Sequence, residues 1–324
     1  MCCWIGVKPK VCGPKLREGT HEACVDKGLC WSVGGLMKPA LFEYLAPGSL
    51  AEAVAMLAEH GDDAKILAGG QSLVPVLNSR LGRYNYMIDI NGLSELSYIR
   101  TDDRWLQIGA LTRQRAIEAS ALVERHAPLL SEATKYIAHL PIRTRGTIGG
   151  SISHADPAAE DPAAMLALDA EFDLISAAGR RTFKARDFFL GPLQTALTPQ
   201  ELLASVRIPL HTSDKTFAFE EVSRRRGDFA IIGIAAELSW AADHIADARI
   251  AVCGLESGVI RLDAAERELN KVQPSERAVA NAARAAADSV EPQEDLHASS
   301  DYRRHLVEIL TQRVLARATR RSIA

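Results

Sequence analysis

The sequence of 324 residues lacks any long apolar run and any strong excess of one charge. Its longest apolar stretch, around residues 231–236, is far shorter than the roughly 18 residues that a membrane span needs. The 38 basic and 41 acidic residues leave a formal net charge of -3, which gives no general attraction to nucleic acid. We therefore expect a soluble, mixed globular protein without a membrane span or a nucleic-acid partner. Its length predicts about two domains.

Cysteine is scarce after the first segment, where Cys253 stands alone. The other cysteines lie within the first 30 residues, without the spacing that a zinc site needs. Residues 1–36 also lack the apolar core of a secretory signal peptide. We interpret residues 1–36 as a disordered extension or an over-extended start upstream of Met37. A single cysteine in the rest of the chain is typical of a reducing cytoplasm.

Two glycine-rich segments carry the clearest functional signal, residues 68–72 (AGGQS) and residues 147–151 (TIGGS). Glycine has no Cβ atom, so such a turn is able to point successive backbone N–H groups at one anion. Two such turns suit the two phosphates of a pyrophosphate. Neither matches the G-x-G-x-x-G of a nicotinamide site or the G-K-[ST] of a P-loop. For either segment alone, an ordinary structural turn is the alternative.

Residues 153–161, directly after the second segment, hold one histidine and three carboxylates. Their close spacing in a loop with two prolines argues against a metal site, and we expect none. Three interpretations stay open: a histidine base poised by a carboxylate, helix-cap chemistry, and a carboxylate that accepts hydrogen bonds from ligand hydroxyls. The basic run at residues 224–226 indicates a solvated turn or a protein contact.

The hydrophobic pattern predicts strands and helices in alternation up to about residue 212, and then a sheet with helices on one side. The first part begins with a strand, helix and strand across residues 64–90, with a glycine turn after the first strand. The other strands are expected at residues 105–110, 171–176, 205–209, 216–222, 229–240 and 245–254. The other helices are expected at residues 50–60, 112–119, 127–138, 157–168, 262–269, 276–288 and 301–318.

With these segments in this order, the chain resembles the FAD-binding medium subunit of the molybdenum hydroxylases. That family includes the medium chain of aerobic carbon monoxide dehydrogenase and the FAD subunit of xanthine dehydrogenase. The resemblance covers residues 37–320. It rests on the following segments: residues 68–72, 108–110, 145–151, 154–157, 187–189, 201–203 and 302–303.

The resemblance implies an α+β fold made of two domains. Residues 37–212 would form a two-subdomain FAD-binding domain of the vanillyl-alcohol-oxidase (PCMH) type, with subdomains at about 37–92 and 93–212. Residues 213–324 would form a smaller α+β C-terminal domain of the carbon monoxide dehydrogenase flavoprotein type.

The resemblance also implies which residues hold FAD. Glu160 would lie near the ribityl chain, Leu203 and Ile137 would form walls, and Phe229 would cover the isoalloxazine. The two glycine segments would hold the pyrophosphate, and they comprise Ala68, Gly69, Gly70, Gln71, Ser72, Thr147, Ile148, Gly149, Gly150 and Ser151. We expect no catalytic acid or base and no metal ligand in this chain.

The implied function is electron transfer within a cytoplasmic heterotrimer, two copies of which would form a dimer of heterotrimers. A large subunit would carry molybdopterin, a small subunit would carry two [2Fe–2S] clusters, and FAD on this chain would pass electrons to an external acceptor. The alternative is a standalone FAD-dependent oxidase or dehydrogenase of the same fold. A nucleotide-binding protein without enzymatic activity is a third class.

Overall fold

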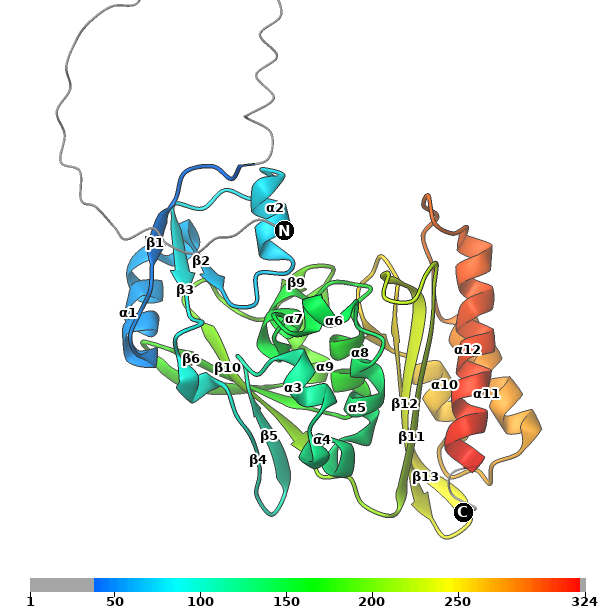
Figure 1. Cartoon of the computed structure of the whole chain (residues 1–324). Helices are drawn as coiled ribbons and strands as arrows, with labels where there is room; N and C mark the ends of the chain where they lie inside the picture. The colour runs from blue at the N-terminus through cyan, green and yellow to red at the C-terminus, as the bar shows by residue number, and fades with distance from the viewer. Residues whose placement is uncertain (1–37, 321–324) are drawn as a thin grey trace, which may run out of the picture. The chain divides into compact units, whose positions relative to one another are not determined.

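The computed structural model describes residues 38–320, and a small parallel sheet begins this part of the chain (Figure 1). Strand β3 lies between β1 and β2 and is parallel to both. The first helix is capped by Ser49, whose side chain accepts the Glu52 N–H, and is followed by Gly61 with φ +48°. The predicted strand, helix and strand across residues 64–90 are thus confirmed. The elements are β1 (Glu43–Leu45), α1 (Leu50–His60), β2 (Ala64–Leu67), α2 (Leu73–Asn78) and β3 (Tyr86–Asp89).

A five-stranded antiparallel sheet follows, in the order β4-β5-β10-β6-β7. Its central strand faces two cores: Leu203 packs into the core under the helices, whereas Leu202 and Ala204 pack into the core of the first sheet. Side chains alternate across a strand, so one strand serves both cores. The strands are β4 (Ile99–Thr101), β5 (Trp105–Gly109), β6 (Glu171–Ser176), β7 (Gly179–Lys184) and β10 (Leu202–Pro209).

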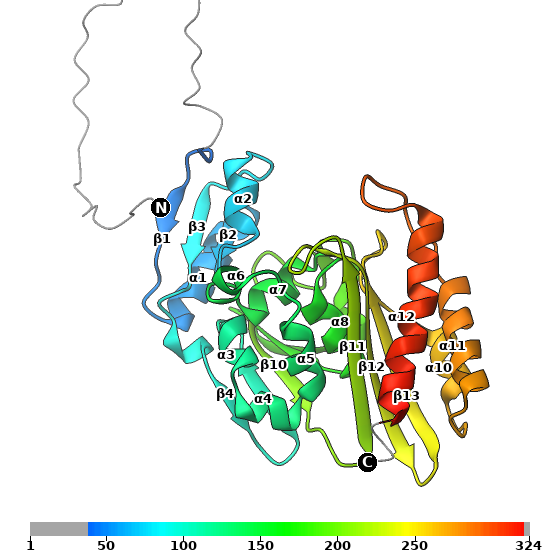
Figure 2. The same cartoon turned by 45° about the vertical axis from the view of Figure 1, so that its right-hand side comes forward.

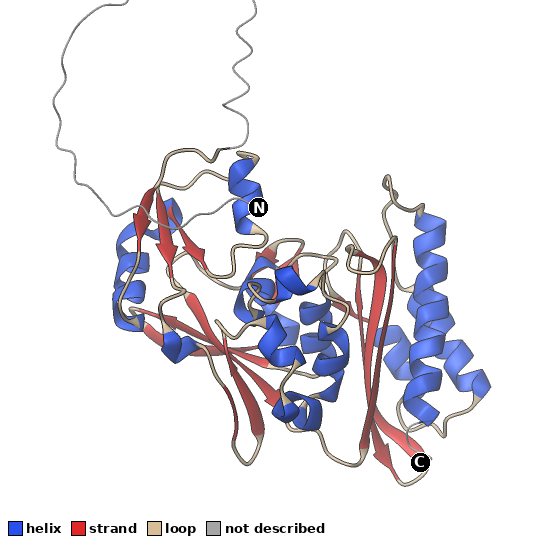
Figure 3. Ribbon diagram, viewed as in Figure 1, coloured by secondary structure: helices blue, strands red, loops and turns tan. Residues whose placement is uncertain are grey.

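Seven short helices and a small hairpin accompany this sheet. Most of the helices lie between the five-stranded sheet and the next sheet along the chain (Figures 1 and 3). They are α3 (Gln114–Glu118), α4 (Ala121–His126), α5 (Pro128–Thr134), α6 (Leu140–Arg143), α7 (Ile148–His154), α8 (Glu160–Ala167) and α9 (Ala185–Phe188), and the hairpin is β8 (Phe189–Gly191) and β9 (Gln194–Thr195).

The C-terminal part is a four-stranded antiparallel sheet with three helices on one face (Figure 2). Its other face packs on α5 and α8, which sequence analysis did not predict. Strand β12 is therefore buried on both faces, which explains its nearly continuous apolar run. The elements are β11 (Lys215–Ser223), β12 (Ala230–Ala241), β13 (His244–Cys253), β14 (Ile260–Arg261), α10 (Asp263–Leu269), α11 (Glu276–Asp288) and α12 (Ser300–Arg320).

Two predictions about local structure are wrong. Residues 147–151 do not form a turn, because Thr147 caps a helix that includes both glycines. The helix predicted at residues 127–138 ends at Thr134. Residues 1–36, with their five cysteines, lie outside the described residues. Within residues 38–320, no helix is both long and apolar enough to cross a membrane.

Candidate functional site

The first glycine segment leaves β2 and leads into α2 (Figure 1). Gly70 has φ +73°, a backbone conformation that costs other residues about 1–2 kcal/mol. Gly69 is buried, and a Cβ atom there would overlap the carbonyl oxygen of Arg145. The lack of a side chain at Gly69 thus lets the first segment touch the residues that lead into the second. The tertiary structure brings the two segments together, although they are far apart in the sequence.

The backbone of this loop carries unused hydrogen-bond donors. The N–H groups of residues 69–73 donate to no acceptor within residues 38–320. The helix pattern begins only with Val74, whose N–H donates to Gly70 at 3.1 Å. The hydroxyl of Ser72 does not cap α2 either. Five consecutive free donors beside a glycine in the left-handed region are a suitable binding place for an anion.

The second glycine segment has no such donors. The N–H groups of its last four residues are all used within the chain: Ile148 donates to Thr112, Gly149 to Ala110, Gly150 to the Thr147 hydroxyl and Ser151 to the Thr147 carbonyl, over 2.9–3.1 Å. The prediction that residues 147–151 form a second cluster of free N–H groups is therefore wrong. The glycines serve packing instead, because a Cβ atom on Gly149 would lie 2.5 Å from the Cβ of Ala110.

Two side chains that sequence analysis missed connect the two segments. The Arg113 guanidinium donates to the Asn91 side chain at 2.7 Å and to the Arg145 carbonyl at 2.5 Å. Asn91 in turn donates to the Ala68 carbonyl at 2.7 Å. No motif in the sequence marks either residue, because each acts through partners that only the fold brings near.

Of the three acidic residues after the second segment, Glu160 and Asp161 are buried and Asp156 is half-buried. Asp161 accepts a hydrogen bond from Gln114 at 2.8 Å, and burial raises its pKa to about 6. Burial and the nearby Glu221 carboxyl raise the pKa of Glu160 well above its ordinary value. Burial likewise raises the pKa of Glu221 to about 8. Glu160 and Glu221 therefore favour the protonated form, which is able to donate as well as accept hydrogen bonds.

Glu160 begins α8 and Glu221 lies on β11, so the two carboxyls lie where strands β11 to β13 face α8. Glu221 is in register with Gly233, which is in register with Cys253. A Cβ atom on Gly233 would lie 2.7 Å from the Cys253 sulfur, so the missing side chain leaves room for the thiol. His154 and Asp156 are 3.9 Å apart, and the residues of the described chain contain no group of three or more potential metal ligands.

The predicted wall residues differ in their exposure. Leu203 and Ile137 are 4% and 8% exposed, whereas Phe229 is 73% exposed on the loop between β11 and β12. Gly227 of that loop has φ +87° and packs against His139, so Phe229 and Ile137 belong to neighbouring segments. The structure thus gathers these two predicted positions in one region, whereas Leu203 is a core residue of β10.

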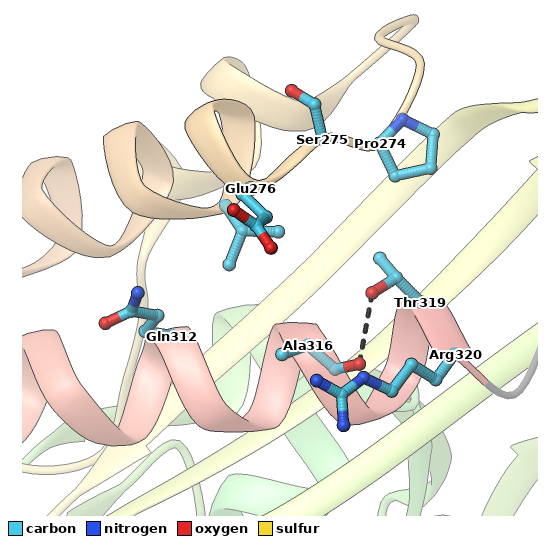
Figure 4. Close-up of a pocket in the computed structure, with 8 residues that line it drawn as sticks. Pro274, Ser275, Glu276, Gln312, Ala316, Thr319 and Arg320 are labelled. Atoms are coloured by element: carbon cyan, nitrogen blue, oxygen red, sulfur yellow. Dashed lines mark hydrogen bonds between the residues drawn. The ribbon is translucent and has the colours of Figure 1, made fainter.

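An open cleft lies elsewhere, between the start of α11 and the end of α12 (Figure 4). Its volume is about 520 Å³. Pro274, Ser275 and Glu276 line one side, and Gln312, Thr319 and Arg320 line the other. No residue predicted to bind FAD lies in this cleft.

Comparison with known families covers most of the chain. Residues 40–211 match the family described as the FAD binding domain in molybdopterin dehydrogenase. Residues 217–318 match the family described as the CO dehydrogenase flavoprotein C-terminal domain.

Individual relatives are similar along nearly their whole length. The chain is 41% identical to the 6-hydroxypseudooxynicotine dehydrogenase complex subunit alpha of Paenarthrobacter nicotinovorans, covering 88% of this chain and 97% of that subunit. It is 41% identical to the caffeine dehydrogenase subunit beta of Pseudomonas sp. (strain CBB1), covering 89% and 98%. A chain in the solved structure of carbon monoxide dehydrogenase from Hydrogenophaga pseudoflava superposes with a TM-score of 0.86 at 39% identity, covering 88% and 99%.

Proposed function

Because this chain belongs to the family of FAD-binding subunits of molybdopterin dehydrogenases, we propose that it carries electrons between partner subunits and an external acceptor. It is an oxidoreductase subunit with FAD as its cofactor and a two-domain α+β fold. Electrons would arrive from [2Fe–2S] clusters on a small subunit, and substrate oxidation would take place on a large molybdopterin subunit.

The free N–H groups of residues 69–73 are the observation that supports this proposal most strongly. A pyrophosphate carries two negative charges and accepts several hydrogen bonds, which five adjacent donors are able to supply. The residues present therefore fit the phosphate part of FAD. When bound, FAD supplies the ability to accept electrons singly and to release them in pairs.

The other predicted residues have distinct proposed roles. Residues 147–151 are held by Ala110 and Thr112 and so fix the preceding Arg145 and Gly146, which lie against Gly69 of the first loop, and Ser151 is a half-buried polar neighbour. Glu160 meets ligand hydroxyls, since a buried carboxyl with a raised pKa both donates and accepts. Ile137 and Phe229 enclose the ring region from adjacent segments, and Leu203 supports the wall from behind. None of these roles requires a catalytic acid or base.

We also propose how the chain is divided into domains, how it assembles with other subunits and where in the cell it lies. Residues 37–212, with subdomains at about 37–92 and 93–212, are the FAD-binding domain, and residues 213–324 are the C-terminal domain. The chain assembles as a medium subunit with a large and a small subunit, as a dimer of heterotrimers in the cytoplasm. A free buried thiol at Cys253 is consistent with a reducing compartment. The substrate pocket would lie on the large subunit, so this chain does not identify the substrate.

A pulldown of the tagged chain from its native host tests the proposal, with a visible spectrum of the eluate. We expect a flavin band, iron–sulfur absorbance, and a larger and a smaller co-purifying subunit. Flavin without partners would favour the standalone FAD-dependent oxidase or dehydrogenase. Absence of flavin would contradict the assignment of loop 68–72.

A further inference from the structure

Arg113 ties the first glycine loop to the backbone that leads into the second segment. Its Nη1 donates to the Arg145 carbonyl at 2.5 Å, and its Nη2 donates to Asn91 Oδ1 at 2.7 Å. Asn91 Nδ2 then donates to the Ala68 carbonyl at 2.7 Å. Three hydrogen bonds thus form a continuous link from Arg145 to Ala68, which we call the Arg113 link.

The far end of the Arg113 link is fixed to the first sheet. Asp89 Oδ1 accepts both the backbone N–H of Asn91, at 2.9 Å, and its Nδ2, at 2.6 Å. Asp89 Oδ2 accepts the Tyr44 hydroxyl at 2.5 Å. Tyr44 lies on β1 and Asp89 ends β3, so the link spans from the parallel sheet to the start of α3.

The loop that the link holds has little internal support. Its five N–H groups at residues 69–73 make no hydrogen bond within the described chain, so they do not stabilise the loop themselves. Its inner support is the Gln71 side chain, which donates to the Gly69 carbonyl at 3.0 Å, together with the N–H groups of Val74 and Val76 in α2, which donate to the Gly70 and Ser72 carbonyls. A loop of this kind keeps its shape only when neighbouring groups hold it, and a preformed shape lowers the cost of binding.

The positive charges of Arg113 and Arg145 beside loop 68–72 also favour binding of an anion there. Burial and the nearby Arg145 cation lower the pKa of Arg113, whereas the Asp89 carboxylate acts in the opposite direction. Arg145 forms no ion pair with any other residue in the range 38–320. A bound pyrophosphate would offset this repulsion.

We propose that Arg113 is a positioning residue for FAD, which holds loop 68–72 against residue 145 so that its free N–H groups are ready for the pyrophosphate. This inference rests on the proposed function, since it takes FAD as the ligand of the loop. Arg113 acts on FAD binding through the loop, because its guanidinium donates to two acceptors at once. A positive charge at this position would not by itself hold the loop in place. The planar guanidinium reaches two acceptors at once, which a lysine ammonium on a flexible stem does not reproduce.

Equilibrium titration of the flavin-free full chain with FAD tests this role, with Kd as the readout. Arg113→Ala should raise Kd roughly 10- to 100-fold, since two hydrogen bonds from a charged donor are lost. Arg113→Lys should resemble Arg113→Ala. Asn91→Ala, which keeps the charge of Arg113, should raise Kd about 10-fold. Arg115→Ala is the matched control, because Arg115 lies on α3, which begins directly after Arg113, and pairs with Glu118 at 2.9 Å.

Each titration is run at a temperature where circular dichroism shows the variant to be fully folded, so loss of fold does not mimic loss of affinity. A wild-type Kd in Arg113→Lys would overturn the positioning role in favour of charge alone. A wild-type Kd in Arg113→Ala would overturn any role of Arg113. Failure of the wild-type chain to bind FAD would instead contradict the proposed function and this inference with it.

Discussion

The two glycine segments have similar sequences and different structures. Residues 68–72 form a loop with free N–H groups. Residues 147–151 form the first turn of a helix, in which the N–H groups of residues 148–151 all donate to acceptors in the chain. The difference arises from the neighbours of each segment. The second segment lies against Ala110 and Thr112, whose carbonyls accept two of its N–H groups, whereas no neighbouring carbonyl accepts the N–H groups of residues 69–73. Each glycine pair thus permits close approach of another stretch of backbone, and the surroundings decide whether its N–H groups stay free.

Gly149→Val should have the largest effect and should act on folding. The new side chain would collide with Ala110, and overpacking of this kind typically costs about 1–3 kcal/mol or more. Urea unfolding of the flavin-free chain measures this loss. Gly92→Ala is the matched control, because a Cβ atom there meets nothing within 4 Å. Equal stability of the two variants would contradict the packing role of Gly149.

Gly69→Ala should act mainly on the cofactor. The added Cβ atom would push the loop away from the Arg145 carbonyl, and the free donors would move with it. We expect FAD to bind roughly 10- to 100-fold more weakly, with a stability loss of about 1–2 kcal/mol. Fluorescence titration with FAD measures the first effect. An unchanged Kd would show that the position of this loop does not matter for binding.

The carboxyls behind the second segment should make stability depend on pH. The pKa of Glu221 is about 8 in the folded chain and ordinarily 4.5, so the folded chain holds more protons than the unfolded chain between these values. Stability should therefore fall as pH rises from about 4.5 to about 8. Glu221→Gln should flatten this slope and gain on the order of 2 kcal/mol at pH 8. A slope as steep as in the wild type would rule out Glu221 as its source.

Substitution of one hydroxyl residue from each segment, Thr147 and Ser72, should give the smallest effects, and opposite ones. Thr147→Ala removes a helix cap and should cost about 1 kcal/mol of stability with little change in FAD affinity. Ser72→Ala removes no cap and should leave the unfolding midpoint unchanged while weakening FAD binding a few-fold. Thermal unfolding together with FAD titration separates the two. The reverse pattern would contradict the different roles assigned to the two segments.

Prediction from sequence succeeded where local pattern decides structure. The helices at 276–288 and 301–318 and the long strands of the C-terminal sheet lie within a few residues of their predicted bounds, because their apolar periodicity is strong. The short strands β1, β4 and β7 were missed, since three to six residues carry little periodic signal. Asn91 and Arg113 were missed for another reason: the three hydrogen bonds of the Arg113 link join residues at least 20 positions apart in the sequence.

The sequence by itself determined the parallel unit around loop 68–72, the sheet and helices of the C-terminal part, and the family resemblance. These depend on residue spacing and on glycines at defined positions, both of which are local properties. Only the tertiary structure decided which glycine segment keeps free donors, how Arg113 links the two, and that Glu160 faces Glu221. Hydrogen-bond satisfaction and burial depend on neighbours distant in the chain, and folding alone brings them together.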